Sequence, residues 1–152
     1  MLFKHKYKSP IGDIGLLAES EFLLSISFTN PDFEGLEATL SAEQLSSVVS
    51  QLNQYFYEGR KSFDIYYKLN TSNFRKTVYE TMKQIPYGTT VTYKELAINA
   101  NSPNAFRAVG TTCGKNPLPI IIPCHRVTSV NGIGGYTGGL NIKRFLLNLE
   151  KN

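Results

Sequence analysis

The stretch TYKELAINANSPNAFRAVGTTCGK, Thr92 to Lys115, decides the fold of the second half of the chain. Thr92 and Glu95 have the spacing of a capping box, which predicts that a helix begins there. Asn101-Ser102-Pro103 predicts a tight turn, and residues 104–114 predict a second short helix. Two short helices joined by a turn, the second polar and basic, are the outline of a helix-turn-helix. A plain helical hairpin packed in a core has the same outline.

Outward from this stretch, the second half is expected to be mostly helical. A helix capped by Thr71 or Ser72 runs to Ile85, where Pro-Tyr-Gly at 86–88 ends it, and residues 89–91 are extended. The glycine-rich segment 131–139 predicts a loop with free backbone amides, but it has neither phosphate-loop pattern, GxxxxGK[ST] or GxGxxG. A last amphipathic helix is expected over residues 141–149, and its inward side chains are Ile142, Phe145, Leu146 and Leu149.

The first half predicts a small lobe of strands and one helix. Leu2–Lys8, Ile14–Ala18 and Phe22–Phe28 have strand patterns, and Phe63–Leu69 is a candidate for one more strand. Ser41 is a plausible cap for an amphipathic helix that Gly59 ends. The sequence therefore predicts an α+β protein of two lobes, residues 1–70 with a three-stranded sheet and a helix, and residues 71–152 mostly helical.

Composition and charge limit the function classes. The chain has 152 residues, 41% of them hydrophobic, and no apolar run long enough to span a membrane. The basic start MLFKHKYKSP lacks a signal-peptide pattern, so the cytoplasm is the expected location. The net charge is +4, but nine of the twelve acidic side chains precede residue 72. A basic second half beside an acidic first half favours a polyanionic partner, nucleic acid first. The two cysteines form no CxxC pair, and the only histidine besides His125 is His5 at the far end of the chain, so the tight ligand spacing of a zinc site is missing and no metal is expected.

The segment PIIIPCHRV, Pro119 to Val127, places a thiol, an imidazole and a guanidinium in a row. A buried strand that ends in a stiff Pro123 turn would present Cys124 as a nucleophile, with His125 as its base. A carboxylate should orient such a histidine, and Glu150 is one of three acids in this half. The plain alternative is a small core cysteine beside a structural histidine. A cysteine hydrolase with Asn116 as partner is a further alternative, and Cys113 is expected to be a packing residue.

Four segments between about Phe74 and Glu150 carry a resemblance: IPYGTTVTYKELA, RAVG, NPLPIIIPCHRV and GYTGGLNIKRFLLNLE. In order and spacing they resemble the methylated-DNA–protein-cysteine methyltransferases, also called 6-O-alkylguanine-DNA alkyltransferases. The resemblance implies a ribonuclease H-like N-terminal lobe and a winged helix-turn-helix C-terminal lobe that carries the alkyl acceptor. It implies direct-reversal repair of double-stranded DNA by a monomer without a cofactor, cytoplasmic and nucleoid-associated when bound to DNA.

The resemblance also implies roles for residues. Cys124 would take the alkyl group of 6-O-alkylguanine irreversibly, and 4-O-alkylthymine is a further candidate substrate. His125 would be the base, acting through a bridging water, with Glu150 orienting it and Asn116 holding the turn. Tyr93 would press on a DNA phosphate and donate a proton or a hydrogen bond to the leaving guanine. Arg107 would replace the extruded nucleotide in the base stack.

Two further groups complete the implied site. The DNA-binding group is Arg107, Tyr93, Thr92, Ala105, Phe106, Ala108, Gly110, Thr111, Lys115 and Arg126. The substrate-binding group is Val127, Tyr136, Thr137, Gly138 and Pro119. Thr137 stands where a serine is common, and Phe106 is bulkier than the alanine often seen. The alternative function is a non-enzymatic sensor of alkylated bases or a regulator, although the family branch without the cysteine is disfavoured because Cys124 is present.

Overall fold

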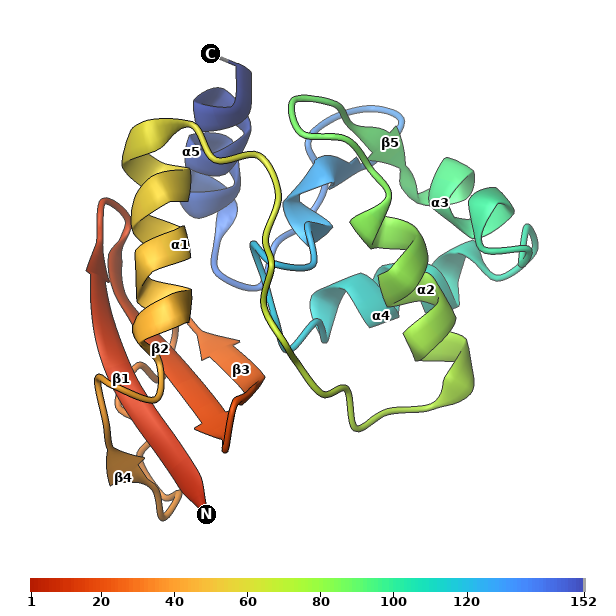
Figure 1. Ribbon diagram of the computed structural model, residues 1–152. Helices are drawn as coiled ribbons and strands as arrows, with labels where there is room; N and C mark the ends of the chain where they lie inside the picture. The colour runs from red at the N-terminus through yellow and green to blue at the C-terminus, as the bar shows by residue number, and fades with distance from the viewer. Residues whose placement is uncertain (152) are drawn as a thin grey trace. The chain divides into compact units, whose positions relative to one another are not determined.

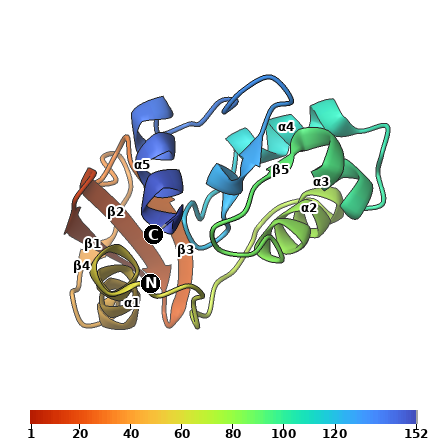
Figure 2. The ribbon, with the colours of Figure 1, turned by 90° about the horizontal axis from the view of Figure 1, so that it is seen from above.

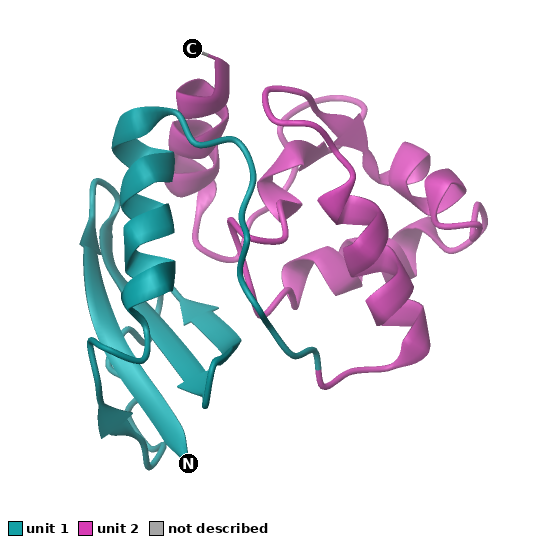
Figure 3. Ribbon diagram, viewed as in Figure 1, with its two compact units in different colours: residues 1–69 teal, residues 70–152 magenta. Residues whose placement is uncertain are grey.

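The computed structural model describes residues 1–151, and the chain divides into two compact units (Figure 3). Unit 1 comprises Met1–Leu69, and unit 2 begins at Asn70. Unit 1 is a sheet with a helix, whereas unit 2 is mostly helical, so the predicted α+β class is confirmed (Figure 1). Among the described residues, no helix has the length and apolar character needed to cross a membrane.

Unit 1 is built on an antiparallel meander of three strands, β1 (Leu2–Ser9), β2 (Gly12–Glu19) and β3 (Phe22–Ser27). A fourth strand, β4 (Thr39–Leu40), pairs in parallel with β1, so the sheet order is β3-β2-β1-β4 rather than the predicted three strands. Phe63–Leu69 does not form a strand. It makes only one bridge, Leu23 with Tyr67, in which Leu23 N–H donates to Tyr66 O at 2.9 Å and Lys68 N–H donates to Leu23 O at 3.1 Å.

Helix α1 (Ser46–Glu58) packs its buried side against this sheet (Figure 2). Tyr7 on β1 stacks on Phe56 with ring centroids 6.3 Å apart, and its hydroxyl donates to Asn53. The helix begins five residues later than Ser41, whose hydroxyl accepts from Gln44 N–H in a preceding turn. It ends at Gly59, as predicted, because this residue adopts the left-handed conformation with φ 73°.

Unit 2 contains α2 (Asn73–Lys83), β5 (Val91–Thr92), α3 (Tyr93–Asn99), α4 (Phe106–Gly114), a 3-10 turn η1 (Cys124–Arg126), β6 (Val127–Thr128) and α5 (Leu140–Lys151). Strands β5 and β6 pair in parallel. Ser72 caps α2, and the capping box of Thr92 with Glu95 is present at α3, so both predicted helix starts are confirmed. Helices α3 and α4 follow each other across a short turn, as the helix-turn-helix pattern predicts.

Two expectations about unit 2 are wrong. Residues 119–122 are a buried turn and not a strand, with only one bridge, Pro119 to Ile122. Ile120 adopts φ 75°, a conformation that is unfavourable for a β-branched residue. On α5, Leu146 is buried as predicted, but Phe145 is 36% exposed, and the fully buried neighbour is Lys143 instead.

Candidate active site

Cys124 is the first residue of the turn η1, and its side chain is only 7% exposed. It lines a cavity of about 300 Å³, called here the thiol pocket, whose lining residues are Tyr93, Gly110, Cys113, Gly114, Cys124, Gly135, Tyr136 and Thr137. Burial raises the pKa of the Cys124 thiol above its ordinary value. Hydrogen bonding by Asn116 and Tyr136 and the charge of Lys143 act in the opposite direction on this pKa. The thiol therefore depends on its neighbours for ionisation.

Asn116 holds the backbone turn that leads to Cys124. Its Nδ2 donates to Ile122 O at 2.7 Å, and its Oδ1 accepts from Leu118 N–H at 2.9 Å. One side chain thus satisfies a donor and an acceptor of a buried segment that has no strand partner. Cys124 N–H in turn donates to Ile122 O at 2.8 Å. These bonds fix the direction in which the thiol leaves the backbone.

A buried ionic cluster lies next to the thiol in the sequence. His125 Nε2 is 2.7 Å from Glu150 Oε2, and both side chains are almost fully buried. Arg126 donates to both oxygens of Glu150, from Nε at 2.8 Å and from Nη2 at 3.0 Å, and to Ile85 O from Nη1 at 2.8 Å. Glu150 therefore neutralises Arg126 and orients His125 at the same time.

The cluster sets the tautomer of His125. Because a carboxylate can only accept, Nε2 must carry the proton that points to Glu150, and Nδ1 is left as the basic nitrogen. Nδ1 is buried and has no hydrogen-bond partner among residues 1–151. Burial lowers the pKa of His125, although Glu150 acts to raise it, so the imidazole is neutral. A neutral imidazole oriented by a carboxylate can accept the proton of a thiol.

Tyr93, at the start of α3, forms one wall of the thiol pocket. Burial raises the pKa of its phenol, and a backbone hydrogen bond from Gly135 lowers it. The phenol is therefore protonated at neutral pH and can act as a donor. Gly134, with φ 80°, allows the loop to approach this ring, because a Cβ there would lie 3.1 Å from Tyr93 Oη and 3.3 Å from Ser129 N. The glycine-rich loop is packed against Tyr93 at this point.

Comparisons with known proteins agree with this geometry. The family model "6-O-methylguanine DNA methyltransferase, DNA binding domain" matches residues 73–152, and the model of the ribonuclease-like domain of the same family matches residues 2–69. A methylated-DNA–protein-cysteine methyltransferase of Methanosarcina acetivorans is 42% identical over 148 residues, which is 95% of each chain.

The chain belongs to the 6-O-methylguanine DNA methyltransferase family.

Solved structures of the family have the same fold. The crystal structure of the Mycobacterium tuberculosis O6-methylguanine methyltransferase superposes with a TM-score of 0.89 at 37% identity, covering 99% of this chain and 93% of that one. A structure of Mycobacterium tuberculosis OGT in complex with DNA gives 0.91 at 37% identity, with coverages of 98% and 92%. The predicted family and fold are thereby confirmed.

Helix α4 carries most of the residues that the sequence assigns to DNA binding in this methyltransferase family member. Phe106, Arg107, Ala108, Thr111 and Lys115 are exposed on or directly after this helix. Ala105 and Gly110 are half-buried, and Gly110 also lines the thiol pocket. The half-buried Thr92 uses its hydroxyl in the capping box of α3.

Arg126 does not fit the DNA-binding group. Its side chain is buried, and its donors are directed at Glu150 and Ile85 O, so it is a partner of the buried ionic cluster and not a surface cation. The resemblance placed Arg126 in the DNA-binding group, whereas the carboxylate that neutralises it lies 24 residues away in the sequence.

Only part of the substrate-binding group lines the thiol pocket. Tyr136 and Thr137 line the thiol pocket, and Thr137 Oγ1 donates to Gly114 O at 2.6 Å. Val127 is buried in β6, and Pro119 is buried in the turn before the thiol. Pro119, Val127 and Gly138 are not among the residues that line the described pocket.

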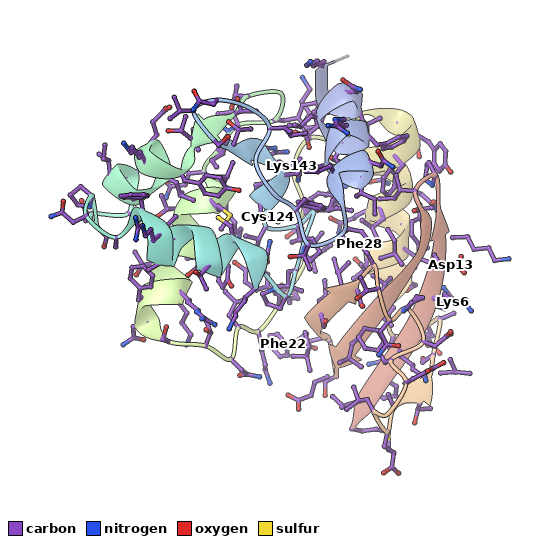
Figure 4. All side chains as sticks on the ribbon, turned by 180° about the vertical axis from the view of Figure 1, so that it is seen from behind. Lys6, Asp13, Phe22, Phe28, Cys124 and Lys143 are labelled. Atoms are coloured by element: carbon purple, nitrogen blue, oxygen red, sulfur yellow. The ribbon has the colours of Figure 1, made fainter. Side chains whose placement is uncertain are left out.

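Two residues of the pocket region were missed. Cys113 is buried, as expected of a packing residue, but it also lines the thiol pocket, and burial together with Cys124 raises its pKa to about 12. Lys143 lies in the interior of unit 2, as does Cys124 (Figure 4). No signal in the sequence marks it, because a single lysine in an amphipathic helix is ordinarily solvent-exposed. Among the described residues, no cluster of three or more His, Cys, Asp or Glu side chains is placed to hold a metal ion.

Proposed function

We propose that this protein repairs alkylated DNA by moving the alkyl group of 6-O-alkylguanine to Cys124, once and irreversibly. It is a methylated-DNA–protein-cysteine methyltransferase that acts by direct reversal. One observation carries this proposal: in a chain of this family, the buried thiol of Cys124 faces a pocket and directly precedes an imidazole that Glu150 holds at 2.7 Å.

The transfer is a single displacement at carbon. His125 Nδ1 takes the thiol proton through one bridging water, and Cys124 sulfur attacks the alkyl carbon. The carbon–sulfur bond forms as the carbon–oxygen bond to guanine breaks. Guanine leaves with the bonding electrons as an anion, which the phenol of Tyr93 stabilises by donating a proton or a hydrogen bond. The product thioether is stable, so each molecule acts once.

Chemistry on a guanine inside a duplex requires that the nucleotide leave the stack, which costs a few kcal/mol. Arg107 is exposed on α4 and is proposed to fill the space that the extruded nucleotide leaves. Small residues beside it, Ala108 and Thr111, allow the helix to lie close to a groove. The positive charge of this half of the chain attracts the phosphates.

Finer assignments extend the proposal. We infer that residues 71–152 are the DNA-binding and alkyl-acceptor domain and that residues 1–70 form a ribonuclease H-like N-terminal lobe. The protein works as a monomer in the cytoplasm, on the nucleoid when bound to DNA, where a reducing environment keeps Cys124 as a thiol. 4-O-alkylthymine is a second candidate substrate.

The intact mass of the protein after mixing with duplex DNA that carries one 6-O-methylguanine tests the proposal. The expected result is a gain of one CH2 group by wild type and by Cys113→Ser, and no gain by Cys124→Ser. Tight lesion binding without any gain of mass in wild type would replace the proposal with a non-enzymatic sensor. If wild type neither binds the lesion nor gains mass, both functions are refuted.

A further inference from the structure

Lys143 is a fully buried lysine whose ammonium group contacts two backbone carbonyls. Its side chain is 0% exposed, and Nζ donates to Val127 O at 2.7 Å and to Gly135 O at 3.0 Å. Among residues 1–151, the ion pairs of the molecule do not include one between Lys143 and a carboxylate. An ammonium ion buried without a carboxylate is unfavourable unless other groups stabilise it.

The two carbonyls belong to two different segments of unit 2. Val127 directly follows the turn that carries Cys124 and His125, and Gly135 directly precedes Tyr136 in the loop that lines the thiol pocket. Lys143 therefore joins the segment that carries the thiol to the loop that covers it. A backbone hydrogen bond from Gly135 also acts to lower the pKa of the Tyr93 phenol, so Gly135 lies beside that phenol as well.

Four other ionisable groups of the site lie on three elements. Cys124 and His125 belong to η1, Cys113 to α4, and Glu150 lies further along α5 itself. Glu150 is already engaged with Arg126 and His125, and His125 is neutral. Burial lowers the pKa of Lys143, and the two cysteines act in the opposite direction, while Lys143 in turn acts to lower the pKa of each cysteine. Cys124 and Lys143 thus support each other's charge.

We propose that Lys143 is a positioning residue of the transfer reaction: as an ammonium ion it ties the pocket loop to the acceptor turn and stabilises the thiolate of Cys124. The His125–Glu150 pair removes the thiol proton, whereas Lys143 supplies the positive charge that the resulting anion needs in a buried site. This inference rests on the proposed function, because it concerns the same thiol.

Alkylation of Cys124 by iodoacetamide, without DNA, separates the two effects of Lys143. Lys143→Gln keeps N–H donors for the two carbonyls but removes the charge, whereas Lys143→Met removes both. The background is Cys113→Ser, so that only one pocket thiol reacts, and Lys151→Gln on the same helix is the matched exposed control. The rate is measured across pH, together with the melting temperature of each variant.

At about pH 7 both Lys143 variants should react about tenfold more slowly than the control, and their rate profiles should move to higher pH. Lys143→Met should in addition show faster hydrogen exchange at residues 135–137. A folded Lys143→Gln with the rate profile of the control would overturn the proposal. Because the assay uses no DNA, a shifted profile in the Lys143 variants together with absent methyl transfer by wild type would refute the proposed function, but it would still show that Lys143 controls the ionisation of Cys124.

The reciprocal effect can be measured without altering Lys143, should its variants fail to fold. The ammonium signal of Lys143 in the isotopically labelled protein is titrated by nuclear magnetic resonance in wild type and in Cys124→Ser. Removal of the thiolate should lower the titration midpoint of Lys143, since coupling between two sites is mutual. Identical midpoints in the two proteins would contradict the proposal.

Discussion

The ion pairs of unit 1 are exposed to solvent, whereas those of unit 2 are buried. In unit 1 the ion pairs Lys6–Asp32 and Lys68–Glu19 lie at the surface, with side chains 40–56% exposed. In unit 2 Glu150 is 1% exposed and pairs with Arg126 and His125. Surface pairs contribute little to stability, whereas buried charges are costly and are retained where they have a use. The contrast indicates that unit 2 carries the chemistry.

A buried polar group is not by itself a functional one, as Gln51 in unit 1 shows. Its Nε2 donates to Asp64 O at 2.8 Å, and its Oε1 accepts from Asp64 N–H at 2.8 Å. The group is neutral, and its amide oxygen and nitrogen are both bonded. The cluster of unit 2 differs because it is ionic and leaves one basic nitrogen, His125 Nδ1, without a partner among the described residues.

The largest expected effect comes from breaking the ionic cluster. Glu150→Ala leaves Arg126 buried without its carboxylate, which should lower the free energy of unfolding by about 3–5 kcal/mol. Methyl transfer should be lost as well, because His125 is no longer oriented. Chemical denaturation and a single-turnover assay measure both effects. The matched change in unit 1, Glu19→Ala, should leave both unchanged, and a similar loss in the two variants would remove the contrast between the units.

A core truncation in unit 1 should affect stability alone. Leu52 is 0% exposed on α1, and Leu52→Ala should lower the free energy of unfolding by about 2–5 kcal/mol through lost burial and a cavity. The transfer rate per folded molecule should remain that of wild type, since the thiol pocket is lined by residues of unit 2 only. A slower rate at full folding would show that the chemistry depends on unit 1.

The pH dependence of stability should be a smaller effect and should belong to unit 2. The pKa of His125 is lowered in the folded protein, mainly by burial, so below its ordinary value of about 6.5 the unfolded chain binds a proton that the folded chain does not. The free energy of unfolding should therefore fall as the pH is lowered through this range. Thermal unfolding between about pH 8 and pH 5 measures it. His125→Gln should lose this component, and an unchanged slope would show that folding does not lower the pKa of His125.

The smallest effect on stability is expected at the exposed face of α4. Arg107→Ala should leave the melting temperature unchanged, because the side chain is exposed. Repair of duplex DNA should slow much more than reaction with free 6-O-benzylguanine, since only the duplex requires extrusion of a nucleotide. Equal slowing with both substrates would contradict a role in extrusion.

Local signals made the helices predictable, and non-local contacts made the rest hard to predict. The capping box at Thr92 and the end of α1 at Gly59 depend on neighbouring residues, and both are confirmed. The apolar run 119–122 was assigned to a strand because hydrophobicity reports burial but not pairing, and Asn116 rather than a neighbouring strand satisfies its backbone.

The site residues, too, were predictable where they depend on neighbours in the sequence and were not predictable where they depend on distant contacts. PCHRV identifies the thiol and its histidine because they are adjacent in the sequence. Arg126 was assigned to DNA because the sequence does not show that Glu150 folds back onto it. Lys143 was missed because its burial depends on carbonyls 16 and 8 residues away, Val127 O and Gly135 O.

The most direct test of the account compares the two cysteines that line the thiol pocket. Wild-type protein is incubated with an excess of duplex DNA that carries 6-O-methylguanine, digested, and the peptides of Cys113 and Cys124 are analysed by mass spectrometry. The account predicts one methyl group per molecule, all of it on Cys124, and no further demethylation of the DNA once that thiol is consumed. Methyl on Cys113, or continued demethylation with Cys124 unmodified, would contradict it.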